Sequence, residues 1–173
     1  MVPTGAAALL LLLIACNRSE PVTNTSTGPA EILFGTRITF GKGGNSEPYK
    51  AGGWGQTEEK FTWTEGTSAL LRVPVAATND PITFKIRMAA LIKPPELPLQ
   101  PVQVYINDQK IAEWQVGDTA EFATPIPPGI TKLGGVLTIN FKTPKATSPK
   151  ALGISVDPRV LGICVLDFEL SKA

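Results

Sequence analysis

Aromatic rings and carboxylates are concentrated in residues 49–66, the stretch best suited to bind a ligand. Trp54 stands among glycines, and Trp63 follows the adjacent pair Glu58 and Glu59. Exposed aromatic rings stack on the C–H faces of sugars, while nearby carboxylates accept hydrogen bonds from the hydroxyls. These four residues therefore predict a carbohydrate-binding platform. The alternative interpretation is that both Trp side chains close one end of a β-sandwich, where the glycines allow close packing.

Asp157 and Arg159 form a second pair of candidate carbohydrate-binding residues, because the proline between them fixes their relative direction. They could pair with each other, cap a loop, or bind Glu58 across the sandwich. Asp157 could also join Asp80 or a glutamate around a calcium ion. The chain has no regularly spaced acidic loop like that of an EF-hand, however, and we predict no metal site.

Catalysis is the least favoured use of these carboxylates. A glycosidase needs two carboxyl groups that flank one sugar. Adjacent Glu58 and Glu59 would point to opposite faces of a strand, so a hydrolase would need a distant Asp as well. The chain has no His, the commonest catalytic base. We therefore expect a protein that is not an enzyme.

The composition excludes several other classes of protein. The 173 residues suit one domain of ordinary size. Two Cys are too few for a zinc or iron–sulfur site, and a net charge of +1 provides no basic surface for nucleic acid. Sixteen Gly and sixteen Pro disfavour long helices. We expect no cofactor and no nucleic-acid partner.

Short runs of alternating apolar residues predict the elements that position these side chains. Residues 82–88 alternate between apolar and polar, as do residues 102–106, 111–116 and 136–141. Asn107 and Asp108, between two such runs, indicate a hairpin turn. Proline clusters at residues 94–98 and 125–128 are typical of crossovers between sheets. Further strands are predicted at residues 32–40, 68–75, 119–123 and 160–170.

This pattern indicates an all-β fold, an antiparallel β-sandwich, because no amphipathic helix interrupts the strands. In the last strand, Cys164 shares one face with Leu166, Phe168 and Leu170 at a spacing of two. Cys164 is therefore predicted to be a small buried hydrophobic residue rather than a reactive thiol.

The first residues carry a targeting signal. The apolar run at residues 6–15 is too short to span a membrane and suits a signal peptide. It ends in Leu13-Ile14-Ala15-Cys16, which resembles a bacterial lipobox and implies cleavage before Cys16 and a lipid on its sulfur. An ordinary secretory signal with an incidental Cys is the alternative. We predict a signal peptide at residues 1–15, lipidated Cys16 and a flexible tether at residues 16–30, and one β-sandwich domain at residues 31–173.

Three stretches carry a combined pattern: Gly53-Trp54 with Glu58 and Trp63-Thr64-Glu65-Gly66; the hairpin Val104-Tyr105-Ile106-Asn107; and the closing run Ser148-Pro149, Leu152-Gly153-Ile154-Ser155, Asp157, Arg159 and Leu161-Gly162-Ile163. This pattern resembles a β-sandwich domain that is appended to membrane glycosyltransferases of bacterial surface-polysaccharide systems. The resemblance spans about residues 34–170, although no transferase domain accompanies it here. It implies a jelly-roll-like fold and an envelope context, and fold analogy alone supplies no activity.

We therefore expect a lipid-anchored, non-catalytic module of the bacterial cell envelope, on the periplasmic or cell-surface side of a membrane. It would bind carbohydrate or support polysaccharide assembly, and its partners would be the membrane, through the lipid on Cys16, and a glycan. The alternative is a protein-interaction subunit that docks onto a membrane glycosyltransferase or envelope complex. Its docking surface would be an edge strand or the proline-rich loops.

Overall fold

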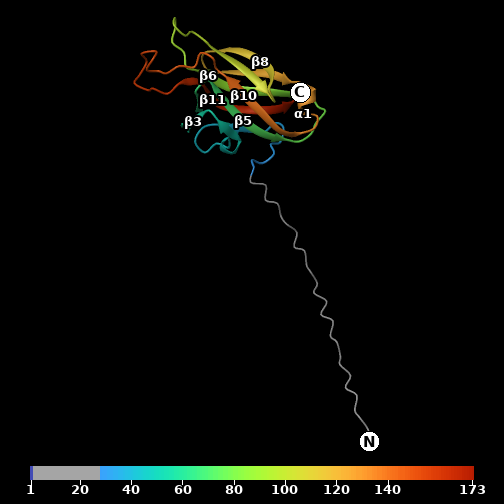
Figure 1. Cartoon of the computed structure of the whole chain (residues 1–173). Coiled ribbons are helices and arrows are strands. Elements are labelled where there is room, and N and C mark those ends of the chain that lie inside the picture. The colour runs from blue at the N-terminus through green and yellow to red at the C-terminus, as the bar shows by residue number, and fades with distance from the viewer. Residues whose placement is uncertain (2–27) are drawn as a thin grey trace.

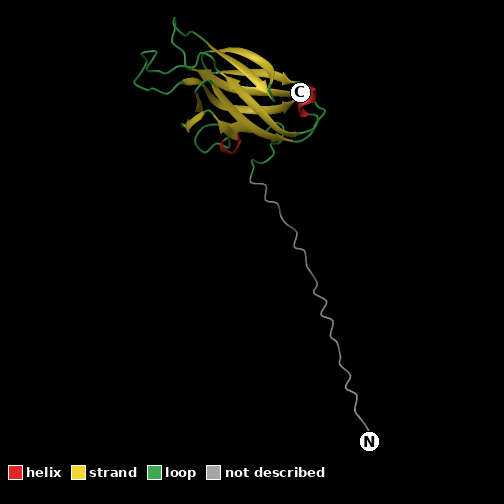
Figure 2. Ribbon diagram, in the orientation of Figure 1, coloured by secondary structure: helices red, strands yellow, loops and turns green. Residues whose placement is uncertain are grey.

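The computed structural model describes Met1 and residues 28–173. The predicted signal peptide, Cys16 and most of the predicted tether lie outside the described residues. Residues 28–173 form two antiparallel β-sheets packed face to face, with only two short helical turns (Figures 1 and 2). The predicted antiparallel, jelly-roll-like β-sandwich is confirmed. Among the described residues, no helix has the length and apolar character needed to cross a membrane.

Within residues 28–173, eleven strands make up the two sheets. The larger sheet has the order β3-β4-β11-β6-β9, and β1 also pairs with β11. The smaller sheet has the order β2-β5-β10-β7-β8. In the larger sheet the strands are β1 (Arg37–Thr39), β3 (Trp54–Thr57), β4 (Thr62–Glu65), β6 (Ile82–Ala90), β9 (Ala120–Ile126) and β11 (Leu161–Lys172). The smaller sheet contains β2 (Lys50–Gly52), β5 (Ser68–Val75), β7 (Gln100–Ile106), β8 (Gln109–Val116) and β10 (Gly135–Lys142). The helical turns are η1 (Glu47–Tyr49) and α1 (Pro128–Thr131).

Alternating side chains build the core between the sheets. On β6, the four apolar residues Ile82, Phe84, Ile86 and Met88 are at most 2% exposed, while the residues between them face outward. The rings of Phe84 and Phe168 lie 6.0 Å apart, and Phe84 also packs on Phe141 at 6.2 Å. Burial of this apolar surface is the main force that holds the two sheets together.

The predicted hairpin forms as expected. Asn107 and Asp108 connect β7 to β8 with φ angles of 47° and 64°. Positive φ at both central residues matches the right-handed twist of paired strands. The Asn107 side chain also accepts a hydrogen bond from the Thr138 N–H at 2.9 Å, which ties the turn to β10.

The proline clusters have two different roles. Residues 91–99 connect β6 in the larger sheet to β7 in the smaller one, so the first predicted crossover is confirmed. The second prediction is only partly correct, because β9 continues through Pro125 to Ile126. Proline is tolerated there because β9 is an edge strand, paired only with β6.

The structure also differs from the predicted strands in its first part, up to β4. The strand expected at residues 32–40 is limited to β1, because Gly35 has a φ of +88° and a turn precedes Arg37. The short strands β2, β3 and β4 fall in a region where no strand was predicted. The pairing of β2 and of β3 with their neighbours contains register shifts, which obscure the alternation of side chains.

A β-bulge in β11 changes which side chains face the core. Val165 pairs with Met88 and Asp167 pairs with Arg87, which leaves Leu166 as the extra residue. The core face consists of Ile163, Val165, Phe168 and Leu170. The prediction that Cys164 and Leu166 share a face with Phe168 and Leu170 is therefore wrong.

Cys164 is nevertheless buried, as predicted, at 7% exposure. It lies on the outer face of the larger sheet, where its neighbours across the strands are Trp63 and Ala89. Burial raises the pKa of the Cys164 thiol to about 11. The thiol is therefore uncharged and poorly reactive at neutral pH.

Candidate functional site

Arg159 is the centre of a cluster of charged side chains at the edge of the larger sheet. It lies just before β11 and binds Asp157 through two guanidinium nitrogens: Nη2 is 2.7 Å from Oδ2, and Nε is 3.0 Å from the same oxygen. The Arg159 N–H also donates to Asp157 Oδ1 at 2.9 Å. The sequence left several contacts open for Asp157 and Arg159, and in the structure the two residues pair with each other. Arg159 holds the pKa of the Asp157 carboxyl below its usual value.

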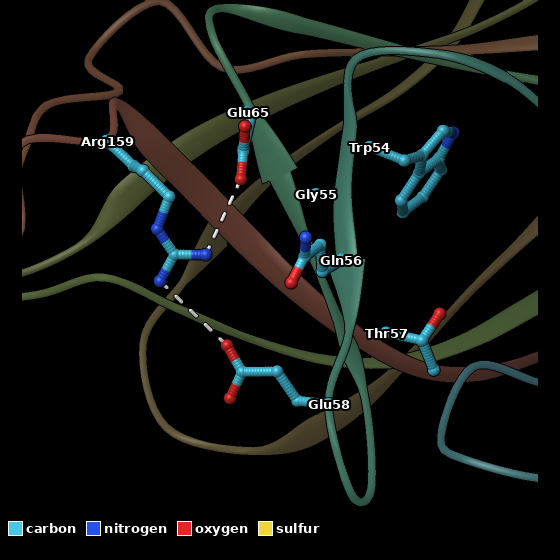
Figure 3. Close-up of a pocket in the computed structure, with 7 residues that line it drawn as sticks. All are labelled: Trp54, Gly55, Gln56, Thr57, Glu58, Glu65 and Arg159. Carbon is cyan, nitrogen blue, oxygen red and sulfur yellow. Dashed lines mark hydrogen bonds and ion pairs between the residues drawn. The ribbon is translucent and has the colours of Figure 1, made fainter.

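Two glutamates approach the same guanidinium from the neighbouring hairpin. Arg159 Nη1 is 3.5 Å from Glu65 Oε1, and Nη2 is 4.0 Å from Glu58 Oε1 (Figure 3). Glu65 is the last residue of β4 and Glu58 lies in the turn between β3 and β4. All three side chains are between 38% and 41% exposed. The contact with Glu58, another option that the sequence left open, is present as a long ion pair, but it lies at the larger sheet and does not cross the sandwich.

These side chains line an open groove of about 770 Å³. Its other lining residues come from β3, where Gln56 points toward the charged cluster (Figure 3). Gly55 leaves the space that the cluster needs, since a Cβ at this position would lie 2.5 Å from Glu65 Oε1. Carboxylate, guanidinium and amide groups therefore converge on one solvent-accessible surface, an arrangement suited to hydrogen-bonding a polar ligand.

Trp54 lies on the other side of β3 (Figure 3). Its indole N–H donates to the Leu70 carbonyl at 2.7 Å, and its ring packs 5.0 Å from Phe40 and 6.3 Å from Phe141. Trp54 therefore packs between the sheets, as the alternative interpretation of this residue requires. It is only partly buried, so it also contributes to the wall of the groove.

Trp63 faces the opposite way from Trp54. Trp54 pairs with Thr64, whose side chain is buried, and Trp63 is next to Thr64 in β4. Neighbouring residues in a strand point to opposite faces, so Trp63 lies on the outer face together with Glu65. Its ring packs edge-on against Phe61 at 5.9 Å. Trp54 and Trp63 consequently do not form the single platform predicted from the sequence.

The remaining predicted site residues separate in space. Glu59 pairs with Lys42 at 3.1 Å and does not line the groove, so it diverges from Glu58. Asp80 pairs with Lys172 at the end of β11, whereas Asp157 precedes the start of that strand. Asp80 and Asp157 therefore cannot share a calcium ion. Among the described residues, no cluster of three or more acidic, Cys or His side chains has a metal-binding arrangement.

Sequence reasoning did not identify Gln56 as a lining residue of the groove and did not place Glu65 beside Arg159. Glu65 is placed by register, because its Cα partner across the sheet is Leu161, two residues after Arg159. That register is not visible in the sequence. The glycine at position 55, next to a bulky Trp, is the one local signal that a side chain from elsewhere occupies this position.

Comparisons with known proteins support the fold. No protein-family model and no curated protein sequence matches the chain. Its structure is similar to the CBM36-1 domain of a multidomain xylanase from the hindgut metagenome of Trinervitermes trinervoides, with a TM-score of 0.50 and 12% identity over 80% of this chain and 97% of that one. A carbohydrate-binding module CBM36 in complex with calcium and xylotriose gives 0.47 and 13%, covering 79% and 99%. The module CsCBM6-3 from Clostridium stercorarium, in complex with cellobiose, gives 0.44 and 12%, covering 80% and 94%.

Proposed function

We propose that this protein is a non-catalytic carbohydrate-binding module of the bacterial cell envelope, held at a membrane by lipid on Cys16. The observation that carries the proposal is the open groove in which Arg159, Glu58, Glu65 and Gln56 converge. Sugars bind through dense networks of hydrogen bonds to such planar polar groups. The CBM36-1 domain of the multidomain xylanase has a similar sandwich fold, which supports the same function.

Hydrolysis is less well supported, although Glu58 and Glu65 line the groove and Asp157 is bound to the Arg159 side chain that lines it too. A glycosidase needs one carboxylic acid with a raised pKa to protonate the leaving group. Arg159 acts in the opposite direction on Asp157, whose pKa is lowered. Glu58 and Glu65 both approach the same guanidinium, that of Arg159, at 4.0 and 3.5 Å. The groove is therefore suited to binding rather than to proton transfer.

Glycan binding can be tested with a matched pair of variants. Arg159→Ala removes the centre of the groove cluster, and we expect loss of binding on a glycan array. Lys110→Ala removes a cation from an exposed ion pair with Glu113 on β8, in the other sheet, and should bind as the parent does. Unchanged binding by Arg159→Ala would show that the groove is not the site.

Membrane attachment needs a separate experiment. Cells that express the protein would be fed an alkyne analogue of palmitate, and the protein would be recovered from membrane and soluble fractions. We expect labelled protein in the membrane fraction, and Cys16→Ser should abolish both the label and sedimentation with membranes. Labelling that persists in Cys16→Ser would rule out this lipid anchor.

One observation favours docking to a protein as a second candidate function. The loop before β11 exposes two aliphatic side chains, Ile154 at 49% and Val156 at 91%. Exposed apolar groups close together often mark an interaction surface. If this loop docks onto an envelope glycosyltransferase, Val156→Asp should prevent co-purification of the enzyme while glycan binding by the groove persists.

A further inference from the structure

The groove carries an excess of negative charge. Asp157, Glu58 and Glu65 contribute three carboxylates around the single guanidinium of Arg159. Among the described residues that line the groove, Arg159 alone is cationic. Glu58 and Glu65 line the groove, whereas Asp157 is not part of its lining and offsets the charge of Arg159. The two glutamates therefore leave an excess of negative charge in the solvent-accessible space of the groove. A bound ligand therefore meets a negative potential.

The three carboxylates also differ in the contacts that they receive from Arg159. Asp157 accepts the shortest hydrogen bonds from the Arg159 side chain, with contacts at 2.7, 3.0 and 3.1 Å. Glu65 receives one long contact at 3.5 Å. Among the described residues, the Glu58 carboxylate is within ion-pair range of Arg159 at 4.0 Å but accepts no hydrogen bond. Glu58 and Glu65 thus keep acceptor oxygens available to a ligand that donates hydrogen bonds.

We infer that this groove selects glycans with protonated amino sugars, such as de-N-acetylated hexosamine polymers, over neutral and acidic glycans. The inference rests on the proposed function and specifies its substrate class. An ammonium group has three donors and a positive charge, and it matches two under-used carboxylates. An N-acetyl group provides one N–H and no charge. A uronic acid carries a carboxylate, which Glu58 and Glu65 repel.

The test compares oligosaccharides that differ in one functional group. A β-1,4-linked glucosamine oligomer, its fully N-acetylated counterpart and a galacturonate oligomer of equal length are titrated into the purified protein by calorimetry. We expect the amine form to bind at least about tenfold more tightly than the N-acetylated form, and the uronate not to bind. Raising the salt from about 0.05 M to about 0.5 M should remove most of this preference, because it screens exposed charges.

Two substitutions, each of which removes one negative charge, test whether the preference for the amine form arises in the groove. Glu65→Gln keeps the shape of the side chain and removes one charge from the groove, so the preference for the amine form should fall about threefold or more. Glu59→Gln makes the same change in the same hairpin, but its carboxylate pairs with Lys42 away from the groove. This control should keep the preference within about twofold of the parent.

The outcomes distinguish a failure of the proposed amine selectivity from a failure of the proposed glycan binding. Equal binding of the amine and N-acetylated forms, or tighter binding of the uronate, overturns the inference and leaves glycan binding intact. An equal loss of preference in Glu59→Gln and Glu65→Gln also overturns it, since the attraction would then come from overall charge. If none of the three oligomers binds and a broader glycan array is also negative, the proposed function itself fails.

Discussion

Removing the Trp54 side chain should destabilise the protein far more than removing that of Trp63, although both side chains are partly buried. The difference follows from the face on which each ring lies. Trp54 packs against the core between the sheets, on Phe40 and Phe141, whereas Trp63 packs on the outer face against Phe61. The variants Trp54→Ala and Trp63→Ala therefore make the same chemical change at two different kinds of position.

The size of the effect can be estimated from the contacts. Replacing a buried Trp by Ala typically costs about 3–5 kcal/mol, and partial burial places Trp54 near the lower end, at about 3 kcal/mol. Within that sum, the hydrogen bond to the Leu70 carbonyl accounts for about 1 kcal/mol, and each aromatic contact for roughly as much. Trp63 has one aromatic contact, so we expect about 1 kcal/mol.

Thermal unfolding followed by far-UV circular dichroism would measure both changes. For a domain of this size, about 3 kcal/mol lowers the Tm by about 6–12 °C, and about 1 kcal/mol lowers it by about 2–4 °C. Trp54→Phe retains a ring and loses the hydrogen bond, so its Tm should fall between that of the parent and that of Trp54→Ala. The inward placement of Trp54 is refuted if Trp54→Ala melts within about 2 °C of the parent, or if Trp63→Ala melts at the lower temperature.

Three further predictions concern stability. Asp108→Gly should stabilise the protein by about 0.5–1 kcal/mol in urea unfolding, because Gly adopts the φ of 64° without steric cost; a loss of stability would contradict this. Burial raises the pKa of Cys164 from 9.0 to about 11, so unfolding releases a proton in that range and stability should fall as pH rises from about 9 to about 11. Cys164→Ala should abolish this slope. Asp167→Ala should cost about 2 kcal/mol, since it removes two hydrogen bonds from Arg87 to a carboxylate that is 9% exposed; a change in Tm too small to measure would contradict it.

The strands that the sequence predicts well are those buried on one face along their whole length. On β5, the residues at every second position from Ala69 to Val75 are at most 1% exposed, and the predicted and observed limits coincide. Burial on one face requires a spacing of two, and that spacing can be counted in the sequence. Crossovers are equally visible where prolines remove hydrogen-bond donors, as in residues 94–98.

Bulges are the main reason that other features could not be predicted. One extra residue in β11, Leu166, moves Cys164 to the outer face although its spacing from Phe168 is even. Shifts in β2 and β3 similarly hide short edge strands in a glycine-rich region. A bulge depends on how neighbouring strands pair, so no count along a single strand reveals it.

The candidate site combines local and non-local information. Asp157 and Arg159 pair because one proline separates them, and the sequence indicates that contact. Glu65 reaches Arg159 because β4 pairs with β11 in one register, which joins residues 94 positions apart in the chain. The first contact is a property of a tripeptide, while the second is a property of the fold.

The glycines around Trp54 connect the core to the groove. Gly53 has a φ of +74°, and a Cβ there would lie 2.0 Å from the Ser68 carbonyl oxygen, so this position requires Gly to let β3 approach β5 with Trp54 directed inward. At Gly55 the obstruction would be the flexible end of Glu65, so a side chain there would displace the carboxylate rather than the backbone. The first glycine therefore serves packing and the second preserves the groove. Neighbouring residues point to opposite faces of a strand, so residues 53–55 contribute to both the core and the groove. Trp54 most resembles a sugar-binding platform in the sequence, but in the structure it supports the site from inside the sandwich.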